Sequence, residues 1–371
     1  MNHTTADGMR VLFVVTALGV GGAERQGLAL ARHFAAIGSQ VRVVSLVSGG
    51  AMAPAFADSL IPVEELGMRR GIPRLSAMPR FRRLVREWRP DIVHSHMIHA
   101  NLFARLALPS RYRKVLICTA HSTNDGGGWR DVAYRITHRR AAVTTNVSRA
   151  GVAAFEHRGA VPRGGMRSMP NGITLPDEPI ESRVAGERLS LLYVGRLEPV
   201  KAVGVLLEAL ALRAGQGAND FLRIVGDGPE RPALQRLVGV LGLEDAVQFA
   251  GHQANVERYF KSADALILTS VNEGLPMVLL EAGASGVPVI ATAVGGVPDL
   301  LGDDRGILVE RSESQCVAEG MRRFASMDSV ARNRMARRMR EHIEKNFAIE
   351  SVGRRWLELY DEVLHHQGRS S

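Results

Sequence analysis

The chain has few cysteines and no uninterrupted apolar run long enough to cross a bilayer. Its 371 residues contain two cysteines, Cys118 and Cys316, which argues against a disulfide framework and favours a reducing, cytoplasmic setting. The apolar run at 11–20 continues into Gly-Gly-Ala-Glu-Arg without a signal-peptide cleavage pattern, so we expect a buried strand there. The segment 275–298 is interrupted by Glu281, glycines and prolines, which predicts a helix followed by a strand rather than a membrane span.

Sequence features of metal and cofactor sites are also missing. There is no Asp-x-Asp sequence to hold a catalytic Mg²⁺, and no complete Gly-x-Gly-x-x-Gly for a dinucleotide. His94, His96 and His99 lie close together, but no acidic residue stands at a spacing that suits a metal. We therefore expect no metal and no cofactor, and we expect these histidines to pack at the end of a strand.

Charge is distributed unevenly along the chain. Residues 1–175 carry 24 Lys and Arg against 10 Asp and Glu. The remaining residues carry 23 Lys and Arg against 28 Asp and Glu, and the net charge of the whole chain is +9. A basic half indicates an anionic partner. Aromatic residues make up only 5%, and zinc-finger and RNA-binding motifs are absent. The charge therefore favours an anionic membrane surface or a lipid-linked substrate over nucleic acid.

Short apolar segments alternate with amphipathic ones, which is typical of α/β proteins with parallel sheets. In the first half we expect helices at 23–37 and 80–88 and strands at 11–16, 41–47, 92–94, 115–120 and 142–147. After a proline-marked linker near 171–188, we expect helices at 203–212 and 276–284 and strands at 189–194, 222–225, 247–250, 265–269 and 288–291. This pattern predicts two domains, residues 1–175 and 176–346, with ligands at the carboxyl ends of the strands and a cleft between the sheets.

The strongest indication of chemistry is the sequence Glu-Gly-Leu-Pro-Met-Val-Leu-Leu-Glu at 273–281. Pro276 suits the first turn of a helix, and a helix start presents N–H groups and a positive dipole end to a phosphate. Glu273 precedes that start and Glu281 lies within the helix, so one carboxylate can reach a sugar hydroxyl while the other binds a pair of ribose hydroxyls. The alternative is a capping acid and a surface acid on an ordinary helix, which the apolar neighbours of Glu281 make less attractive.

A second indication is the sequence Gly-Arg-Leu-Glu-Pro-Val-Lys at 195–201, directly after an apolar run. Two cations at the end of a strand, Arg196 and Lys201, can hold a diphosphate and neutralise it as it departs, a task that a metal performs in other enzymes. Taken alone, this segment is equally well interpreted as a solvated turn with an Arg–Glu pair.

Glycines follow two further strands. Gly226 and Gly228 flank Asp227, and glycine lets the backbone approach a base or ribose closely, although a tight turn is the simpler alternative. Gly21 and Gly22 follow the first strand and open a helix, the place where Rossmann folds hold phosphates.

Two basic features of the first half each have two interpretations. His121 ends the strand at 115–120 beside a glycine-rich loop, and it either faces the cleft or is a satisfied surface histidine. The segment 80–89 places apolar residues at helical spacing among arginines, which predicts a core-packed helix with a charged outer face or a membrane-surface helix. In the second case the basic surface would extend to Arg111, Arg113, Lys114, Arg139 and Arg140.

Together these motifs resemble those of glycosyltransferase family 4, whose retaining members have the GT-B fold of two Rossmann-like domains facing across a cleft. The resemblance is to the members that build bacterial polysaccharides, and it covers nearly the whole chain. The matching segments are residues 21–25, 90–96, 170–173, 194–197, 225–229 and 273–281. In this family the last helix crosses back to the first domain, which implies a third segment at 347–371.

The resemblance implies roles for the matching residues. The first domain would bind the acceptor and the second the nucleotide sugar. The implied catalytic groups are His121, Glu273, Arg196 and Lys201. The implied donor-binding residues are Gly22, Arg196, Lys201, Gly226, Gly228, Glu273, Gly274, Leu275 and Glu281. One departure is Ala202, where a glycine often follows the lysine.

The implied activity is hexosyl transfer with retained anomeric configuration, without a metal, from a UDP-sugar to a lipid-linked or polysaccharide acceptor. The protein would be cytoplasmic and peripheral at the inner face of the cell membrane. A nucleotide-sugar epimerase of similar fold and a non-catalytic nucleotide-sugar- or membrane-binding protein are the alternatives.

Overall fold

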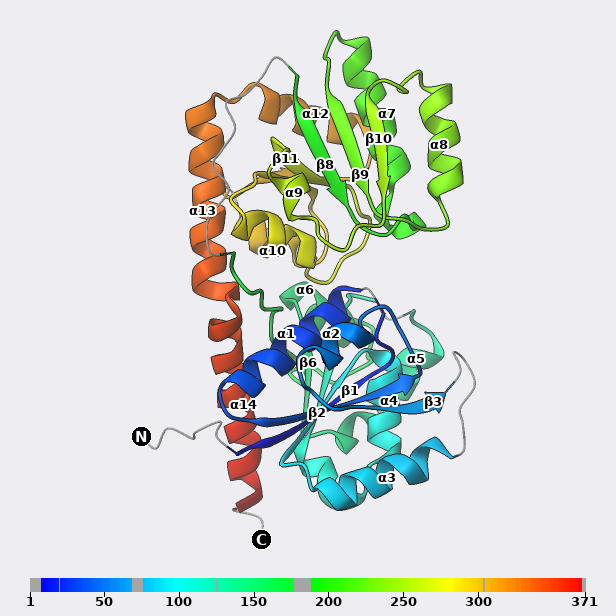
Figure 1. Cartoon of the computed structure of the whole chain (residues 1–371), viewed down its shortest axis with the longest axis vertical. Helices are drawn as coiled ribbons and strands as arrows, with labels where there is room; N and C mark the ends of the chain where they lie inside the picture. The colour runs from blue at the N-terminus through cyan, green and yellow to red at the C-terminus, as the bar shows by residue number, and fades with distance from the viewer. Residues whose placement is uncertain are drawn as a thin grey trace. The chain divides into compact units, whose positions relative to one another are not determined.

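The computed structural model describes residues 8–19, 21–68, 76–124, 126–176, 188–302 and 304–368. The chain divides into two compact units: unit 1 comprises Met1–Thr174 and Phe347–Ser371, and unit 2 comprises Leu175–Asn346. Each unit is built on one parallel β-sheet covered by helices (Figure 1), so the α/β class with two Rossmann-like domains is confirmed. Much of the expected linker, residues 177–187, lies outside the described residues.

Unit 1 contains a seven-stranded sheet in the order β3-β2-β1-β4-β5-β6-β7. Its strands are β1 (Arg10–Val15), β2 (Gln40–Val47), β3 (Val63–Met68), β4 (Ile92–His96), β5 (Leu116–Ala120), β6 (Val143–Asn146) and β7 (Arg167–Ser168). Its helices are α1 (Gly22–Ala36), α2 (Ala53–Ala57), α3 (Ala77–Trp88), α4 (Ile98–Ala107), α5 (Trp129–Thr137), α6 (Arg149–His157) and α14 (Ile349–Gly368), with the 3₁₀ turns η1 (Ser110–Val115) and η2 (His138–Arg140).

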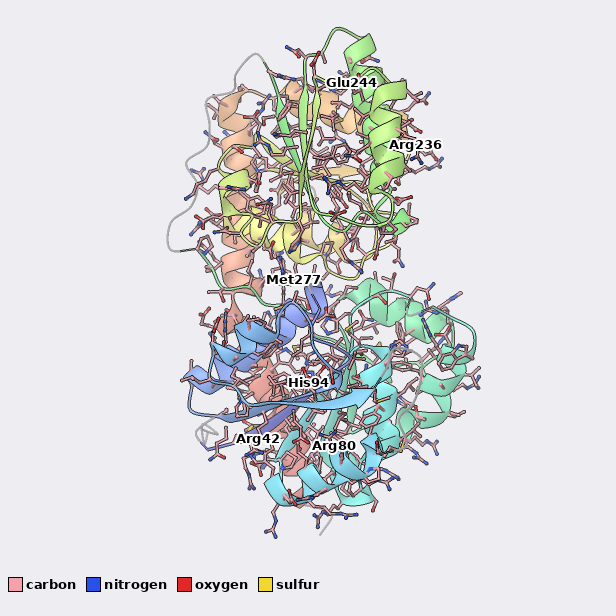
Figure 2. The ribbon with its side chains drawn as sticks, turned by 45° about the vertical axis from the view of Figure 1, so that its right-hand side comes forward. Arg42, Arg80, His94, Arg236, Glu244 and Met277 are labelled. Carbon is pink, nitrogen blue, oxygen red and sulfur yellow. The ribbon has the colours of Figure 1, made fainter. Side chains whose placement is uncertain are left out.

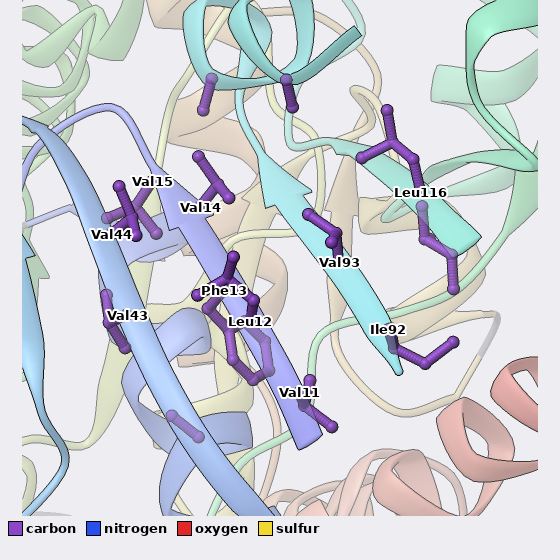
Figure 3. Close-up of a cluster of buried hydrophobic side chains, with 14 of the residues drawn as sticks. Val11, Leu12, Phe13, Val14, Val15, Val43, Val44, Ile92, Val93 and Leu116 are labelled. Carbon is purple, nitrogen blue, oxygen red and sulfur yellow. The ribbon is translucent and has the colours of Figure 1, made fainter. Parts of the chain in front are cut away.

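The core of unit 1 is formed where the central strands are covered on both faces. After Arg10, every residue of β1 is buried, and Val43 and Val93 of the neighbouring strands pack beside it (Figure 3). Strands buried on both faces read as continuous apolar runs, which is why β1 was visible in the sequence. In the register of the sheet, Phe13 stands between Val43 and His94.

Helix α14 completes this core although it lies about 180 residues further along the chain than β7. The backbone N–H of Ile349 donates to the carbonyl of Ile173, and the N–H of Ile173 donates to the carbonyl of Phe347, both over 2.8 Å. Trp356 and Tyr360 of α14 are buried in the same cluster as β1 and α1. The last helix is therefore an integral part of unit 1.

Unit 2 contains a six-stranded parallel sheet in the order β10-β9-β8-β11-β12-β13. Its strands are β8 (Ser190–Val194), β9 (Phe221–Val225), β10 (Val247–Gly251), β11 (Ala265–Leu268), β12 (Val289–Thr292) and β13 (Ile307–Val309). Its helices are α7 (Val203–Gly215), α8 (Arg231–Val240), α9 (Glu257–Phe260), α10 (Met277–Ala284), α11 (Val297–Leu301), α12 (Ser314–Ala325) and α13 (Ser329–Phe347), with the 3₁₀ turn η3 (Pro199–Lys201).

Helix α3 decides between the two interpretations of the basic segment at 80–89. Phe81, Leu84 and Val85 are buried in the core of unit 1, and Arg42 lies 5.2 Å above the ring of Trp88. Figure 2 shows Arg80 on the outer side of this unit. The membrane-surface interpretation of α3 is therefore wrong, because the side chains that would enter a bilayer already pack in the core. Within the described residues, no helix is both long enough and apolar enough to span a bilayer.

Candidate functional site

The sheet of unit 2 has a switch point between β8 and β11. From β8 the chain moves outward to β9 and β10, and it then returns to the other side of β8 at β11. All neighbouring strands are parallel, so the loops that follow β8 and β11 leave the same edge side by side. Open α/β sheets bind ligands in the crevice at such a point. The two strongest sequence motifs, at 195–201 and 273–281, begin in these two loops, and the second continues into α10.

Lys201 and Glu273 form an ion pair at this switch point. Lys201 Nζ lies 2.5 Å from Glu273 Oε1, and the two side chains are only 18% and 10% exposed. The loops that carry them are joined by the N–H of Val271, which donates to the carbonyl of Val200 over 2.9 Å. A cation and a carboxylate 72 residues apart are thus brought into direct contact and shielded from water.

Glu273 is not a helix cap. Helix α10 has no side-chain cap, and Pro276 precedes its first residue, Met277, with extended backbone. The expectation that Pro276 belongs to the first turn is wrong by one residue, which is the usual uncertainty of a helix boundary. The capping interpretation of Glu273 fails, because its carboxylate is bound to Lys201 instead.

Arg196 lies in a solvated turn and pairs with a glutamate, as the simpler interpretation of its segment predicted. Its side chain is 64% exposed, and Nη1 lies 2.7 Å from Glu198 Oε1. Its backbone is held by the buried Tyr193, whose hydroxyl donates to the carbonyl of Arg196 over 3.1 Å. Burial, and then the nearby carboxylates of Glu273 and Glu198, raise the pKa of Tyr193 above its ordinary value. The position of the arginine is thus fixed at its backbone while its guanidinium faces solvent.

Ala202 occupies the position where the related family often has glycine. Its φ is +48°, in the left-handed region, which glycine adopts without strain and alanine does at a cost of about 1–2 kcal/mol. The turn nevertheless forms, since Thr269 Oγ1 donates to the carbonyls of Lys201 and Ala202 at 3.2 and 3.1 Å. This departure from the motif does not disturb the position of Lys201.

The glycines after β9 are required by the neighbouring loop. A Cβ added to Gly226, whose φ is +140°, would lie 1.8 Å from the carbonyl oxygen of Gly195, and one added to Gly228 would lie 2.3 Å from that of Leu197. The loops after β8 and β9 are joined by the N–H of Leu197, which donates to the carbonyl of Asp227 over 2.9 Å. The structure therefore explains both glycines without a ligand, and their contact with a nucleotide stays a prediction.

Gly295 is a part of this site that the sequence motifs did not include. Its φ is +56°, and an added Cβ would lie 1.9 Å from the carbonyl oxygen of Glu273. The N–H of Gly296 donates to the carbonyl of Gly274 over 2.7 Å. A pair of glycines a few residues after a strand, Gly295-Gly296 after β12 as Gly21-Gly22 after β1, was the available signal. Gly295 therefore lets the loop after β12 support the backbone at Glu273 and Gly274.

Gly274, Leu275 and Glu281 complete the predicted donor side. Gly274 and Leu275 are buried in the loop before α10, and Glu281 is partly exposed about one turn into this helix. Helix α10 also packs closely against α13, since a Cβ on Gly283 of α10 would lie 2.5 Å from Ile343 of α13. Unit 2 therefore contains Arg196, Lys201, Glu273 and Glu281, with Lys201 and Glu273 in contact.

Unit 1 contains a chain of histidines. His121 follows β5, and its Nε2 lies 2.9 Å from Nδ1 of His96. The ring of His96 lies 4.1 Å from that of His94, which hydrogen-bonds to Tyr360 and Thr119 over 2.8 and 2.7 Å. His94 is drawn inside unit 1 in Figure 2. The expected packing at a strand end is confirmed for His94 and His96 and is wrong for His99, which is exposed on α4. No three His, Cys, Asp or Glu side chains among the described residues could hold a metal together.

These imidazoles are neutral near pH 7. Burial lowers the pKa of His121 to about 4. Burial, and then repulsion from the other histidines, lowers the pKa of His96 well below its ordinary value, and the same causes act on His94. His121 can therefore donate or accept one hydrogen bond, but at neutral pH it does not carry a charge.

We expect this cluster to make unit 1 sensitive to acid. The folded pKa values lie below the unfolded value of 6.5, so the unfolded chain binds more protons as the pH falls from 6.5 toward 4. Each histidine then removes up to about 1.4 kcal/mol of stability per pH unit. Urea denaturation at a series of pH values measures this slope. His121→Asn should make it shallower, whereas His157→Asn, an exposed control on α6, should leave it unchanged; equal slopes for all three proteins would contradict the expectation.

Gly22 is the first residue of α1 and lies directly after its cap, Gly21, which makes no side-chain cap bond. A Cβ on Gly21 would lie 2.3 Å from Glu24 Oε2, so the Glu24 side chain lies close against the backbone at this helix start. The sequence placed both glycines correctly at the helix start. Proximity of Gly22 to a phosphate or an acceptor stays a prediction.

Comparison with known families covers most of the chain in two segments. The family model described as Glycosyltransferase Family 4 matches residues 20–175, and that described as Glycosyl transferases group 1 matches residues 176–345. The chain belongs to glycosyltransferase family 4. In this family 4 chain, the two matched segments meet one residue from the division between unit 1 and unit 2.

Curated relatives resemble about half of this family 4 chain. N-acetyl-alpha-D-glucosaminyl L-malate synthase of Bacillus anthracis is 34% identical over 47% of the chain and 45% of its own length. The putative colanic acid biosynthesis glycosyltransferase WcaL of Escherichia coli is 30% identical over 51% of the chain and 46% of its own length. The chain spans about half the length of the curated relatives it matches.

Solved structures show that the family 4 chain has the GT-B fold. A glycosyltransferase of Rickettsia africae superposes with a TM-score of 0.80 at 19% identity, covering 96% of this chain and 99% of the other. HepE of Anabaena, solved in complex with UDP-glucose, gives 0.80 at 21% identity, covering 95% and 100%. At such identities the likeness establishes the fold alone.

Proposed function

We propose that the protein is a retaining glycosyltransferase that moves a sugar from a UDP-sugar to a lipid-linked or polysaccharide acceptor, at the inner face of the cell membrane and without a metal ion. The observation that carries the proposal is the shielded Lys201–Glu273 pair at the β8/β11 switch point. The UDP-glucose complex of HepE and the colanic acid assignment of WcaL support a UDP-sugar and a cell-surface glycan.

In this proposal, the cations of unit 2 bind the diphosphate of the donor. Lys201 is already positioned by Glu273, and Arg196 leaves Glu198 to reach the phosphates. As the bond between the anomeric carbon and the phosphate oxygen breaks, both side chains stabilise the negative charge that collects on the leaving diphosphate. Lys201 can do this with little reorganisation, since its position is set before the donor arrives.

The remaining groups bind the sugar and the ribose. Glu273 accepts hydrogen bonds from sugar hydroxyls, and Glu281 accepts them from the ribose. The acceptor oxygen bonds to the anomeric carbon on the face that the diphosphate leaves, and a phosphate oxygen takes the acceptor's proton, so the configuration is retained. Burial lowers the pKa of His121, so its imidazole is neutral. In this proposal His121 therefore acts through a hydrogen bond and not through a charge.

Nucleotide release from a panel of nucleotide sugars, with and without lipid-linked acceptors, tests the proposal. We expect release of UDP that depends on the acceptor, and we expect Arg196→Ala to slow it by about tenfold or more, the value of a charge-assisted hydrogen bond to phosphate. Arg236→Ala is the matched control, because Arg236 is an exposed arginine of the same unit on α8 (Figure 2).

Two outcomes would contradict the proposal. Conversion of the donor into an isomeric nucleotide sugar without any acceptor would instead identify an epimerase. Binding of nucleotide sugars without turnover across a broad acceptor panel would identify a binding protein. An inverted anomeric centre in the product, read by proton NMR, would overturn the retaining assignment alone.

A further inference from the structure

Helix α5 has an apolar face that nothing in the described part of the chain covers. Trp129, Val132 and Ile136 are 66%, 58% and 75% exposed. They stand at positions i, i+3 and i+7, so they form one stripe along the helix. Single exposed apolar residues are ordinary on protein surfaces, but three large ones aligned on one short helix mark a contact surface.

Arginines border this stripe on both sides. Arg130 and Arg135 lie about 100° away from Trp129 and Ile136 in opposite directions around the helix. The guanidinium of Arg130 lies 5.6 Å from the ring centroid of Trp129. Arg139 and Arg140 follow in η2. The single carboxylate of the two elements, Asp131, is bound to Arg158 over 3.1 Å, so the local charge is strongly positive.

The opposite face of α5 is firmly attached to unit 1. Tyr134 is buried, and its hydroxyl accepts a hydrogen bond from Asn101 Nδ2 over 2.7 Å. The buried Arg105 lies 4.5 Å above the ring of Tyr134 and donates to the hydroxyl of Thr144 over 2.9 Å. The helix therefore cannot turn its apolar stripe inward without breaking this network, and the stripe is a permanent feature of the surface.

We propose that α5 docks unit 1 on an anionic membrane surface, with Trp129, Val132 and Ile136 inserted at the level of the lipid headgroups. Tryptophan favours that level of a bilayer, and arginines beside an apolar stripe extend toward lipid phosphates. The charge is complementary, because unit 1 carries most of the positive excess of the chain. The docking site is thus α5 and η2, and not α3, whose apolar side is buried.

This surface is connected to the proposed reaction through one short segment. His121 is separated from Trp129 by seven residues, so a docked α5 holds the His121 loop close to the bilayer, where a lipid-linked acceptor is found. Only this connection depends on the proposed function. The docking of α5 itself can be measured without any turnover.

Vesicle sedimentation tests the docking. We expect the protein to bind vesicles of phosphatidylcholine mixed with phosphatidylglycerol, to bind phosphatidylcholine alone weakly, and to dissociate in high salt. Ile136→Glu should weaken binding by about tenfold or more, since one inserted apolar side chain is lost. Val240→Glu is the matched control: Val240 is 82% exposed on α8 in unit 2, and its substitution changes the net charge equally. Equal binding of both variants would overturn the proposal.

Tryptophan fluorescence locates the contact. The chain contains three tryptophans, of which Trp356 is buried and Trp88 lies beneath Arg42. Brominated lipids should therefore quench Trp129. In Trp129→Phe, which keeps an aromatic ring, binding should persist while most of the quenching disappears. Quenching that survives this substitution would place the contact elsewhere.

Two further measurements separate this proposal from its rivals. If light scattering shows a dimer that Ile136→Glu converts to a monomer, with vesicle binding unchanged, α5 is an interface between copies and the proposal fails. Slow donor hydrolysis in detergent-free solution should be equal for Ile136→Glu and the unmodified protein. If neither protein hydrolyses the donor but Ile136→Glu binds vesicles more weakly than the unmodified protein, the proposed reaction fails and the docking stands.

Discussion

Lys201→Met is expected to lower kcat/KM by about two to three orders of magnitude, the usual loss when one preorganised group that stabilises developing charge is removed. Lys201 lies against Glu273 in a shielded position, so no mobile surface cation can replace it. Glu273→Gln should also lose activity. Because each residue positions the other, the double variant should be little worse than the more damaging single one. Steady-state rates and urea denaturation of all three proteins measure activity and stability separately.

An ordinary ion pair in the same unit provides the control. Lys261 and Glu257 of α9 are 2.8 Å apart and considerably more exposed, and Lys261→Met should change the rate little. A folded Lys201→Met protein with normal turnover would contradict the assignment of the site. An additive double variant would show that the two residues act independently.

Gly226→Ala is expected to destabilise unit 2 by about 3 kcal/mol or more, because two costs coincide. The new Cβ would overlap the carbonyl oxygen of Gly195 at 1.8 Å, and φ is +140°, which alanine rarely adopts. Either the loop after β8 or that after β9 must move, so UDP binding should weaken as well. The free energy of unfolding in urea and calorimetric titration with UDP measure the two effects.

Gly242→Ala separates the two costs. Gly242 also has a positive φ, +65°, but an added Cβ would meet nothing within 4 Å. Its substitution should therefore cost only about 1 kcal/mol, the strain of the left-handed backbone. If both variants lose the same stability, steric contact between the loops is not what requires glycine at position 226.

Most strands and the helices α1, α3, α7 and α10 were predicted from the sequence, whereas α4, α6, α8 and α12 were not. β1, β5 and β11 are covered on both sides and read as short apolar runs, so sequence and structure agree within a residue or two. β3 was missed because Val-Glu-Glu-Leu-Gly-Met is a polar strand beyond β2 at the edge of the sheet. α5 was missed for the opposite reason: its large apolar residues face solvent, so the polarity pattern does not indicate a buried side.

The composition of the site was predictable, but its contacts were not. Residues after neighbouring parallel strands must meet at one edge, which placed Lys201 and Glu273 in the same region. That they bind each other depends on the lengths of both loops and on Val271 bonding to Val200, and no local pattern encodes this. The constraint on Gly295 was equally hidden, because the carbonyl that it avoids belongs to a loop about 20 residues earlier.

The contribution of α14 to unit 1 determines the order in which the chain can fold during synthesis. Unit 2 is a continuous stretch, whereas the core of unit 1 needs Val352, Trp356 and Tyr360 from the last helix. A ribosome that has made the first 174 residues has not yet supplied those side chains, and the apolar surface they cover stays open while the next 170 or so are added. The half of the protein that is translated first is therefore finished last, and during that interval it depends most on chaperones.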